Sequence, residues 1–197
     1  MPEIIQGDCL SVMAGMDAAS VDCELEIRGM GFNNTGYPGA FTPTVQNIIR
    51  TVIGPPGQQK VLNLFSGVST IGDERVDLER PEATLRENVR EFIARDERRW
   101  DFVLLDPPYE IKRKSKLAAY GSVSSVAADV PLRRELAAYL VKHACNVLWL
   151  DACAPLPSGF DRRRLWLLLP GGYHMVRILS WLIRKPGLFA TRGGEEK

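Results

Sequence analysis

The stretch Phe102-Val103-Leu104-Leu105-Asp106-Pro107-Pro108-Tyr109 joins an apolar run to a rigid turn. Four consecutive apolar residues are typical of a strand in a parallel sheet, which is buried on both faces. The two prolines that follow have no backbone N–H to donate, so we expect the strand to end at Asp106. Because open α/β sheets bind ligands beyond the carboxyl ends of their strands, residues 106–109 are expected to line a ligand site.

The polar groups of this turn suit a reaction at the exocyclic amino group of a nucleic-acid base. Such a nitrogen is a poor nucleophile because its lone pair is delocalised into the ring, and two acceptors that each take one N–H can free that lone pair. The Asp106 carboxylate and the Pro107 carbonyl are candidates for these acceptors, and Pro108 removes a competing donor. Tyr109 offers an aromatic face for a base turned out of its stack. The alternative is a Pro-Pro turn whose tyrosine packs on the surface.

Residues 106–109 match the whole of the signature D/N/S-P-P-Y/F/W. Here the chain resembles the class I S-adenosylmethionine-dependent amino-methyltransferases of nucleic acid. The aspartate form is most similar to the adenine-N6 branch; the cytosine-N4 branch often begins with serine, and some RNA guanine-N2 enzymes carry Asp or Asn. The resemblance implies a Rossmann-like fold, S-adenosylmethionine as cofactor, and a catalytic loop made of Asp106, Pro107, Pro108 and Tyr109.

A second stretch, Val61 to Gly67, is typical of an apolar strand that ends in a turn of small residues. It resembles the F-x-G-x-G cofactor loop of the same family, in which the backbone approaches the methionine and the ribose. The resemblance implies that Phe65, Ser66 and Gly67 bind the cofactor, and a glycine permits such a close approach. The chain departs from the pattern at Ser69, which stands where the second glycine would be.

The connection from Gly67 to Asp77 is too short for the usual crossover helix, since a whole crossover normally needs at least roughly 10 to 12 residues. We therefore expect a shortened first crossover with a single helical turn at Ser69–Gly72, followed by a strand over Arg75–Leu78. Asp77, at the end of that strand, is the candidate for the two ribose hydroxyls, a role that acidic residues play in nucleotide-binding folds. The alternative is a solvated surface carboxylate.

The resemblance assigns two further positions. Asn88 lies in the stretch where the family often places a polar side chain against the cofactor adenine, and the alternative for it is the exposed face of a helix. Thr42 is a candidate N-cap for the segment 41–50. That segment resembles the helix that precedes the cofactor strand and closes over the methionine end, and it is equally consistent with a plain packing helix.

The N-terminal residues 4–10 and 20–22 are similar to the segment that leads into the D-P-P-Y strand in the same family. Here residues 23–27 follow instead, and no Pro-Pro pair arrives. Either the order of the parts is rearranged or this is a remnant strand that now serves as a sheet edge. Asp8 is therefore an open candidate for a cofactor contact.

Apolar runs alternate along the chain with amphipathic segments, which predicts an α/β domain with a mostly parallel sheet between two layers of helices. The expected strands are Val61–Phe65, Arg75–Leu78, Phe102–Asp106, Val147–Leu150, Leu165–Leu169 and Met175–Ile183, and the expected helices are Thr44–Ile53, Pro81–Arg95 and Pro131–His143. Residues 28–43 and 110–130 lack periodicity and are expected to be loops. Pro170-Gly171-Gly172-Tyr173 predicts a C-terminal antiparallel hairpin between the last two strands. We expect one domain over residues 1–186 and a frayed tail over 187–197.

The composition is that of an ordinary globular protein: 197 residues, 45% hydrophobic and 25% charged. A net charge of +1 gives no global field that would draw the protein onto nucleic acid or a membrane, so any contact with a polyanion must be local. Four cysteines without C-x-x-C spacing and two histidines indicate neither a zinc site nor a disulfide framework. Without a membrane-spanning run or a leader pattern, we expect a cytoplasmic protein.

A basic cluster directly after the motif is the candidate for local contacts with phosphates: Lys112, Arg113, Lys114 and Lys116. The alternative is a solvated loop, as charge runs often are. The leading hypothesis is methylation of adenine N6 in DNA; the alternatives are an RNA base methyltransferase and a non-catalytic subunit that kept the fold. Outside residues 110–130 the sequence leaves no segment for a DNA-reading domain, so a DNA enzyme would need a partner subunit, a homodimer or low specificity.

Overall fold

One mixed sheet forms the centre of the molecule. The structure is a computed structural model and describes residues 23–32, 36–37, 40–108, 129–171 and 175–186. The strands of this part are β1 (Glu24–Gly29), β2 (Val61–Leu64), β3 (Glu74–Asp77), β4 (Leu85–Arg86), β5 (Trp100–Leu105), β6 (Ala144–Asp151), β7 (Phe160–Leu169) and β8 (Arg177–Arg184). Its helices are α2 (Pro43–Ile53), α3 (Val89–Arg95) and α5 (Val130–His143). Within these described residues, eight strands join in the order β1-β7-β8-β6-β5-β2-β3-β4.

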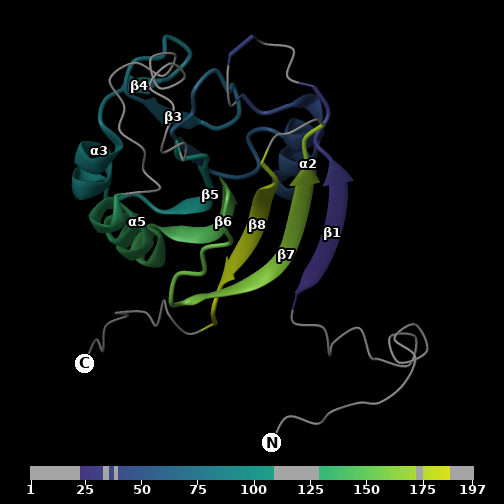
Figure 1. The fold of residues 1–197 in the computed structure, drawn as a ribbon. Helices are drawn as coiled ribbons and strands as arrows, with labels where there is room; N and C mark the ends of the chain where they lie inside the picture. The colour runs from purple at the N-terminus through teal and green to yellow at the C-terminus, as the bar shows by residue number, and fades with distance from the viewer. Residues whose placement is uncertain (1–22, 33–35, 38–39, 109–128, 172–174, 187–197) are drawn as a thin grey trace, which may run out of the picture.

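The helices form a layer on each face of this sheet (Figure 1). α3 and α5 cover one face, over a core that includes Val103 and Trp149. α2 covers the other face, over a core that includes Leu104 and Leu148. Because successive side chains of a strand point to opposite faces, β5 and β6 contribute to both cores in turn. The predicted three-layer α/β architecture is confirmed.

The direction of β8 sets it apart within the described sheet. β8 runs antiparallel to both of its neighbours, β6 and β7, whereas the other strand pairs are parallel. The mostly parallel sheet and the antiparallel C-terminal strands are therefore confirmed, although residues 172–174 between them lie outside the described range. Since Asp151, the last residue of β6, pairs with Ile178, the first residue of β8 stands at the edge where β5 and β6 end. That first residue is Arg177.

The chain changes direction across the sheet between β4 and β5. From β2 it steps outward to β3 and then to β4, and it returns so that β5 pairs with the other side of β2. In open α/β sheets, ligands bind at such a switch in strand order, beyond the carboxyl ends of the two strands that flank it. The two stretches singled out in the sequence follow these two strands.

The helix expected over Pro81–Arg95 is wrong in its first half. Leu85 and Arg86 instead pair with Val76 and Asp77 as the short strand β4. Thr84 holds this segment against the sheet, because its hydroxyl oxygen accepts the backbone N–H of Arg75 at 2.8 Å. The helix begins only after Asn88, whose side chain caps it.

The single helical turn expected at Ser69–Gly72 is also wrong, although the first crossover is indeed short. The connection from β2 to β3 is a loop, held where the Asn63 side-chain amide donates to the Ile71 carbonyl at 2.9 Å. Gly72 then adopts φ +116°, which disfavours other residues, and a Cβ there would lie 3.1 Å from that of Asn63. The loop therefore runs close to β2 at this point.

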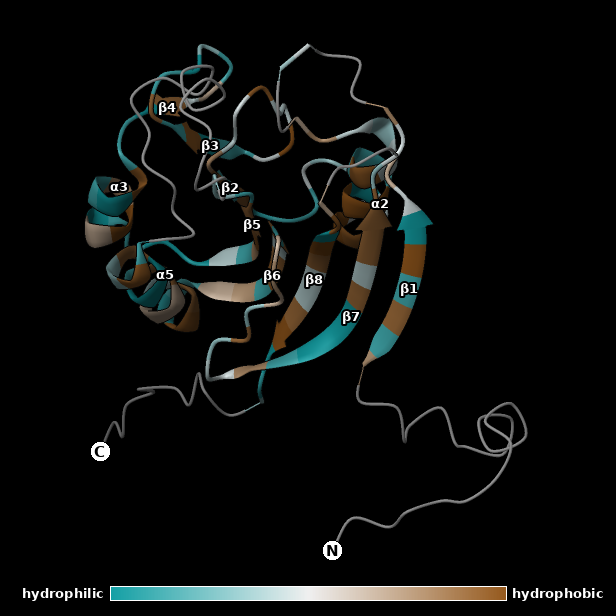
Figure 2. Cartoon of the chain, viewed as in Figure 1, coloured by the Kyte–Doolittle hydropathy of each residue, from teal (hydrophilic) through white to brown (hydrophobic). Residues whose placement is uncertain are grey.

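The strand β1 lies at the edge of the sheet and pairs in parallel with β7. An edge strand at this place agrees with one of the two alternatives, although residues 4–10 and 20–22 lie outside the described residues. The irregular segment expected from residue 28 begins after Gly29 instead. Polar and apolar residues alternate along β1 (Figure 2). Leu25 and Ile27 are 61% and 62% exposed, so the described helices leave this end of the sheet uncovered.

The helix α2 begins as the sequence predicts. Thr42 is its N-cap and accepts the backbone N–H of Val45 at 3.4 Å, while Pro43 occupies the first turn, where no backbone donor is needed. The Thr42 hydroxyl also donates to the carbonyl of Met30, which ties the helix to the segment after β1. Among the described residues, no helix is long and apolar enough to cross a membrane.

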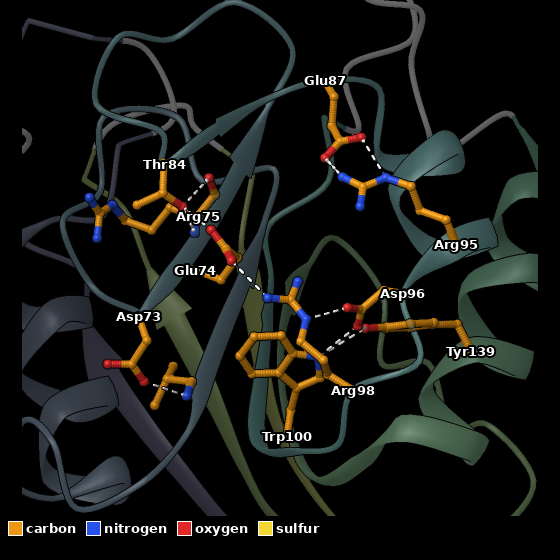
Figure 3. A network of polar contacts seen from close by, with 11 residues as sticks. Asp73, Glu74, Arg75, Thr84, Glu87, Arg95, Asp96, Arg98, Trp100 and Tyr139 are labelled. Carbon is orange, nitrogen blue, oxygen red and sulfur yellow. Dashed lines mark hydrogen bonds and ion pairs between the residues drawn. The ribbon is translucent and has the colours of Figure 1, made fainter.

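A buried carboxylate joins the helical layer to the start of β5 (Figure 3). Asp96 accepts hydrogen bonds from the Tyr139 hydroxyl at 2.6 Å, from the Trp100 indole N–H at 3.0 Å and from Arg98. Burial acts to raise the pKa of Asp96, but the three donors outweigh it and the pKa lies below its usual value. The carboxylate thus fixes α5 against the end of β5 that lies away from the candidate site.

We predict that Asp96→Ala lowers the free energy of unfolding by about 2 to 3 kcal/mol, because buried donors lose a charged acceptor. Since the pKa is depressed in the folded state, this stabilisation is present at neutral pH and is lost as the pH falls below about 4. Urea unfolding at pH 7 and at pH 3 measures both effects. Glu135→Ala, which breaks an exposed ion pair with Arg90, is the control and should cost much less. If the two variants lose the same free energy of unfolding at pH 7, Asp96 does not have the structural role assigned to it.

Candidate functional site

The parallel pairing of β2 and β5 brings together the two predicted loops. Leu64 and Leu105, the last residues of β2 and β5, are partners in the parallel register. Residues 65–67 and 106–108 therefore leave the sheet side by side. Tyr109 and the basic cluster at residues 112–116 lie outside the described residues, as does Asp8. Their roles stay predictions.

The loop after β2 has an unusual backbone. Phe65 adopts φ +59°, a left-handed conformation that is an outlier for a bulky residue. Ser66 follows it, buried, with its backbone N–H donating to the Val76 carbonyl at 3.0 Å. Its hydroxyl oxygen is buried and has no hydrogen-bond partner within the described part of the chain. Strained backbone and an unmatched buried hydroxyl are costly features, and such features gather at ligand sites.

Gly67 completes this loop with φ +54°. Its backbone N–H donates to Asp77 Oδ2 at 2.9 Å, so the ends of β2 and β3 are joined. The other carboxylate oxygen of Asp77 accepts the backbone N–H groups of Glu79 and Arg80, each at 3.1 Å. Asp77 thus organises the loop. Because an ionised carboxylate offers about four acceptor positions, it keeps capacity for the predicted ribose contact.

Tyr37 covers the same loop from the segment that follows β1. A Cβ on Gly67 would lie 3.1 Å from the Tyr37 ring, and the Arg80 guanidinium lies 4.0 Å from the ring centroid. Burial raises the pKa of the Tyr37 phenol, and the charges of Asp77 and Asp106 act in the same direction. Tyr37 is therefore a neutral aromatic wall beside both loops. Tyr37 lies in residues 28–43, which show no periodic pattern, so the sequence does not predict it.

Asp106 is the most perturbed carboxyl at this edge. Its side chain is 12% exposed, and Oδ1 accepts a hydrogen bond from Arg177 Nη2. Burial raises the pKa of Asp106 to about 6; Arg177 acts against this shift and the charge of Asp151 adds to it. The carboxyl is therefore mostly ionised at neutral pH and titrates close to it. Perturbed groups of this kind are concentrated at active sites.

Arg177 is the main residue that the sequence analysis missed. It lies 71 positions after Asp106 and reaches the site only because β8 runs antiparallel beside β6. The available signal was an arginine among the apolar residues of a predicted strand. Nearby, Asp151 at the end of β6 pairs with Arg133 of α5, with 2.8 Å between Oδ2 and Nη2.

Asn88 has a structural role at the start of α3. Its side-chain oxygen accepts the Arg90 backbone N–H at 2.9 Å and caps the helix. It follows β4, which is parallel to β3, and so lies at the same edge of the sheet as the two loops. Its contact with a cofactor adenine stays a prediction.

A comparison with solved structures finds several chains that match this one in structure. A chain described as "Putative methyltransferase yhhF from Escherichia coli" is 13% identical, with a TM-score of 0.48, and the match covers 81% of this chain and 98% of that one. A "putative RNA methyltransferase" from Pyrococcus horikoshii is 15% identical at a TM-score of 0.47, over 82% and 92% of the two chains. A conserved hypothetical protein from Streptococcus pyogenes is 17% identical at 0.45, over 71% and 96%.

No family model matches the chain, and no curated protein matches it significantly. With TM-scores below 0.5, the matched solved structures establish neither the fold nor the function of this chain. The case for a function is therefore made on the residues of the site itself.

We predict that Asp77→Ala weakens binding of S-adenosylmethionine by about 1 to 3 kcal/mol, because the loop amide and the ligand hydroxyls lose a charged acceptor. Calorimetric titration measures the change. Asp73→Ala is a matched control: Asp73 also accepts a backbone N–H, that of Val61 at 2.8 Å (Figure 3), but it lies at the opposite end of β3 from Asp77. Its affinity should equal that of the wild type. If both variants bind as the wild type does, Asp77 is not part of the cofactor site.

Proposed function

We propose that this protein transfers a methyl group from S-adenosylmethionine to the exocyclic amino group of a nucleic-acid base, with adenine N6 in DNA as the first candidate. One observation carries the proposal. Asp106, a buried carboxyl with a pKa of about 6, starts a Pro-Pro loop directly beside the strained loop at residues 65–67, where the strand order switches. In an α/β sheet this is the place for a ligand.

The loop after β2 fits the cofactor in three respects. The Ser66 hydroxyl is buried without a partner among the described residues, so a bound polar ligand would satisfy it. The left-handed backbone at Phe65 turns the chain sharply where a ligand has to approach. Asp77 fixes the Gly67 amide and keeps acceptor capacity for hydroxyls. Phe65, Ser66, Gly67 and Asp77 are therefore the residues proposed to hold it.

The residues after β5 supply what an amino nucleophile needs. When bound, S-adenosylmethionine would supply a methyl carbon attached to a sulfonium sulfur, and that sulfur would keep the electrons of the broken C–S bond. Asp106 and the Pro107 carbonyl each accept one N–H of the amino group, which draws the lone pair out of the ring. The nitrogen becomes positive as the new N–C bond forms and then loses one proton. The ionised Asp106 carboxylate stabilises that charge and can take the proton.

We predict that Asp106→Asn lowers the rate of methyl transfer by a factor on the order of a hundred or more, as expected for a positioned polar group that acts in the transition state. Single-turnover transfer of labelled methyl groups to mixed DNA and RNA fragments measures it. Asp101→Asn is the matched control in the same strand. Asp101 Oδ2 accepts the Lys60 N–H at 2.7 Å at the opposite end of β5, so its loss should leave the rate unchanged.

Three outcomes separate the hypotheses. Methyl transfer to RNA alone would support amino methylation and would show that the substrate is RNA and not DNA. Binding of S-adenosylmethionine without any transfer would favour a non-catalytic subunit. If Asp106→Asn keeps the wild-type rate on its best substrate, amino methylation through this loop is wrong.

The basic cluster is proposed to contact the phosphates around the target base. Replacing Lys112, Arg113, Lys114 and Lys116 by alanine should weaken binding to every sequence and flatten its dependence on salt, by roughly 0.7 to 0.9 in slope per lost contact. Fluorescence anisotropy over a salt series measures this, with cofactor affinity as the internal control. If the affinity of wild type and variant falls with salt at the same slope, the cluster is solvated surface.

A further inference from the structure

Two buried ion pairs lie at the carboxyl edge of the sheet, one at Asp106 and one at Asp151. Arg177 is 5% exposed and hydrogen-bonds to Asp106, at the end of β5. Asp151 is 1% exposed and pairs with Arg133 of α5. The two arginines of these pairs are supplied by different elements.

The position of Arg177 is fixed by the register of its strand. Arg177 pairs with Leu168 of β7, and Leu168 and Leu179 belong to the core that α2 covers. On β5, Leu104 belongs to the same core, and Asp106 continues that alternation two residues later. Since β6 lies between β8 and β5, the Arg177 side chain reaches across the end of β6 on the α2 side to meet the carboxylate.

Stability alone does not account for a buried arginine at this place. Taking both charges of an ion pair out of water costs about as much as their attraction returns, so apolar residues of similar volume would serve the fold equally well. Leu179, on the same side of the same strand, shows that the α2 face accepts such a residue. What the guanidinium adds is a fixed orientation and a positive charge for one carboxylate.

We propose that Arg177 is the positioning residue of Asp106: it holds the carboxylate in its ionised form and engages Oδ1, which leaves Oδ2 to accept an N–H from the target amino group. This role rests on the proposed function in so far as it concerns catalysis. The ion pair itself can be tested without any substrate.

The charges around Asp106 determine the sign of the expected effect. It faces Arg177 from β8 and Asp151 from β6, whose charge Arg133 of α5 offsets, and Tyr37 lies nearby as a neutral phenol. Burial and Asp151 raise the pKa of Asp106, and Arg177 is the group that opposes them. Removing Arg177 must therefore raise this pKa further, so that the carboxyl becomes protonated at neutral pH and loses its capacity to accept the N–H.

The test compares Arg177→Met, which removes the charge and keeps an apolar stem, with Arg177→Lys, which keeps the charge. Carbon-13 NMR titration of the aspartate carboxyls, with the Asp106 signal identified by its loss in Asp106→Asn, reads the pKa directly. We expect Arg177→Met to move the Asp106 titration up by roughly one to three pH units and Arg177→Lys to return most of the shift. Arg164→Met, which removes an arginine paired with Glu24 on β1, is the charge-matched control and should leave Asp106 unchanged.

The pH dependence of methyl transfer supplies the catalytic readout. The wild-type rate should rise through pH 6 to a plateau, and in Arg177→Met the rise should move to higher pH by the same interval as the NMR titration. A shifted titration in a protein that transfers no methyl group would uphold the ion pair and overturn the proposed function. An unshifted Asp106 titration in Arg177→Met would overturn the assignment of Arg177, whatever the activity.

A further variant covers the case in which Arg177→Met does not fold. The double variant Asp106→Asn/Arg177→Met removes both charges, so it should fold if the lone carboxylate was the cause. Failure of the double variant as well would contradict the assignment, because it would show that Arg177 serves the packing of β8 and not the carboxylate.

Discussion

The return of the chain from β4 to the far side of β2 is the constraint on which the candidate site depends. It makes β2 and β5 neighbours, and their register aligns Leu64 with Leu105, so the two loops that follow leave the sheet together. Separated by further strands, the loop at residues 65–67 and the loop at Asp106 could not act on one pair of ligands. The two loops can therefore act together only because the order of the strands places them side by side.

The antiparallel strand β8 is the second element that completes the site. If β8 were parallel to the other strands, its first residue would lie at the opposite edge of the sheet from Asp106. Because β8 is reversed, its first residue, Arg177, lies at the edge where the parallel strands end. The exposed ion pair of Arg90 with Glu135 lies on the helices, where screening by water makes it weak. The buried pair of Asp106 and Arg177 is shielded, so Arg177 acts strongly against the rise that burial causes in the pKa of Asp106.

Apolar runs, helix caps and turn residues predict those strands and helices whose formation depends on neighbouring residues in the chain. β2, β5 and α2 were predicted because each has its own apolar pattern or cap, and Asp106 was predicted because the turn after β5 is distinctive. β4 was missed because two residues are too short to show alternation, and a side-chain contact from Thr84 holds that segment on the sheet. Arg177 and Tyr37 were missed because the order of the strands in the sheet brings them to the site. Neighbouring residues in the sequence do not indicate that order. The contacts of the predicted cofactor residues with a ligand stay predictions.

The most direct test of the account is the identity of the methylated atom. The full chain is incubated with S-adenosylmethionine carrying a labelled methyl group and with unmethylated DNA and RNA, and the nucleic acid is then digested to nucleosides for mass spectrometry. We expect the label on an exocyclic amino nitrogen, with N6-methyldeoxyadenosine as the first expected product. Label on a ring carbon or a ribose oxygen, or no label in either nucleic acid, would contradict it, since the acceptors at Asp106 and Pro107 suit an amino group.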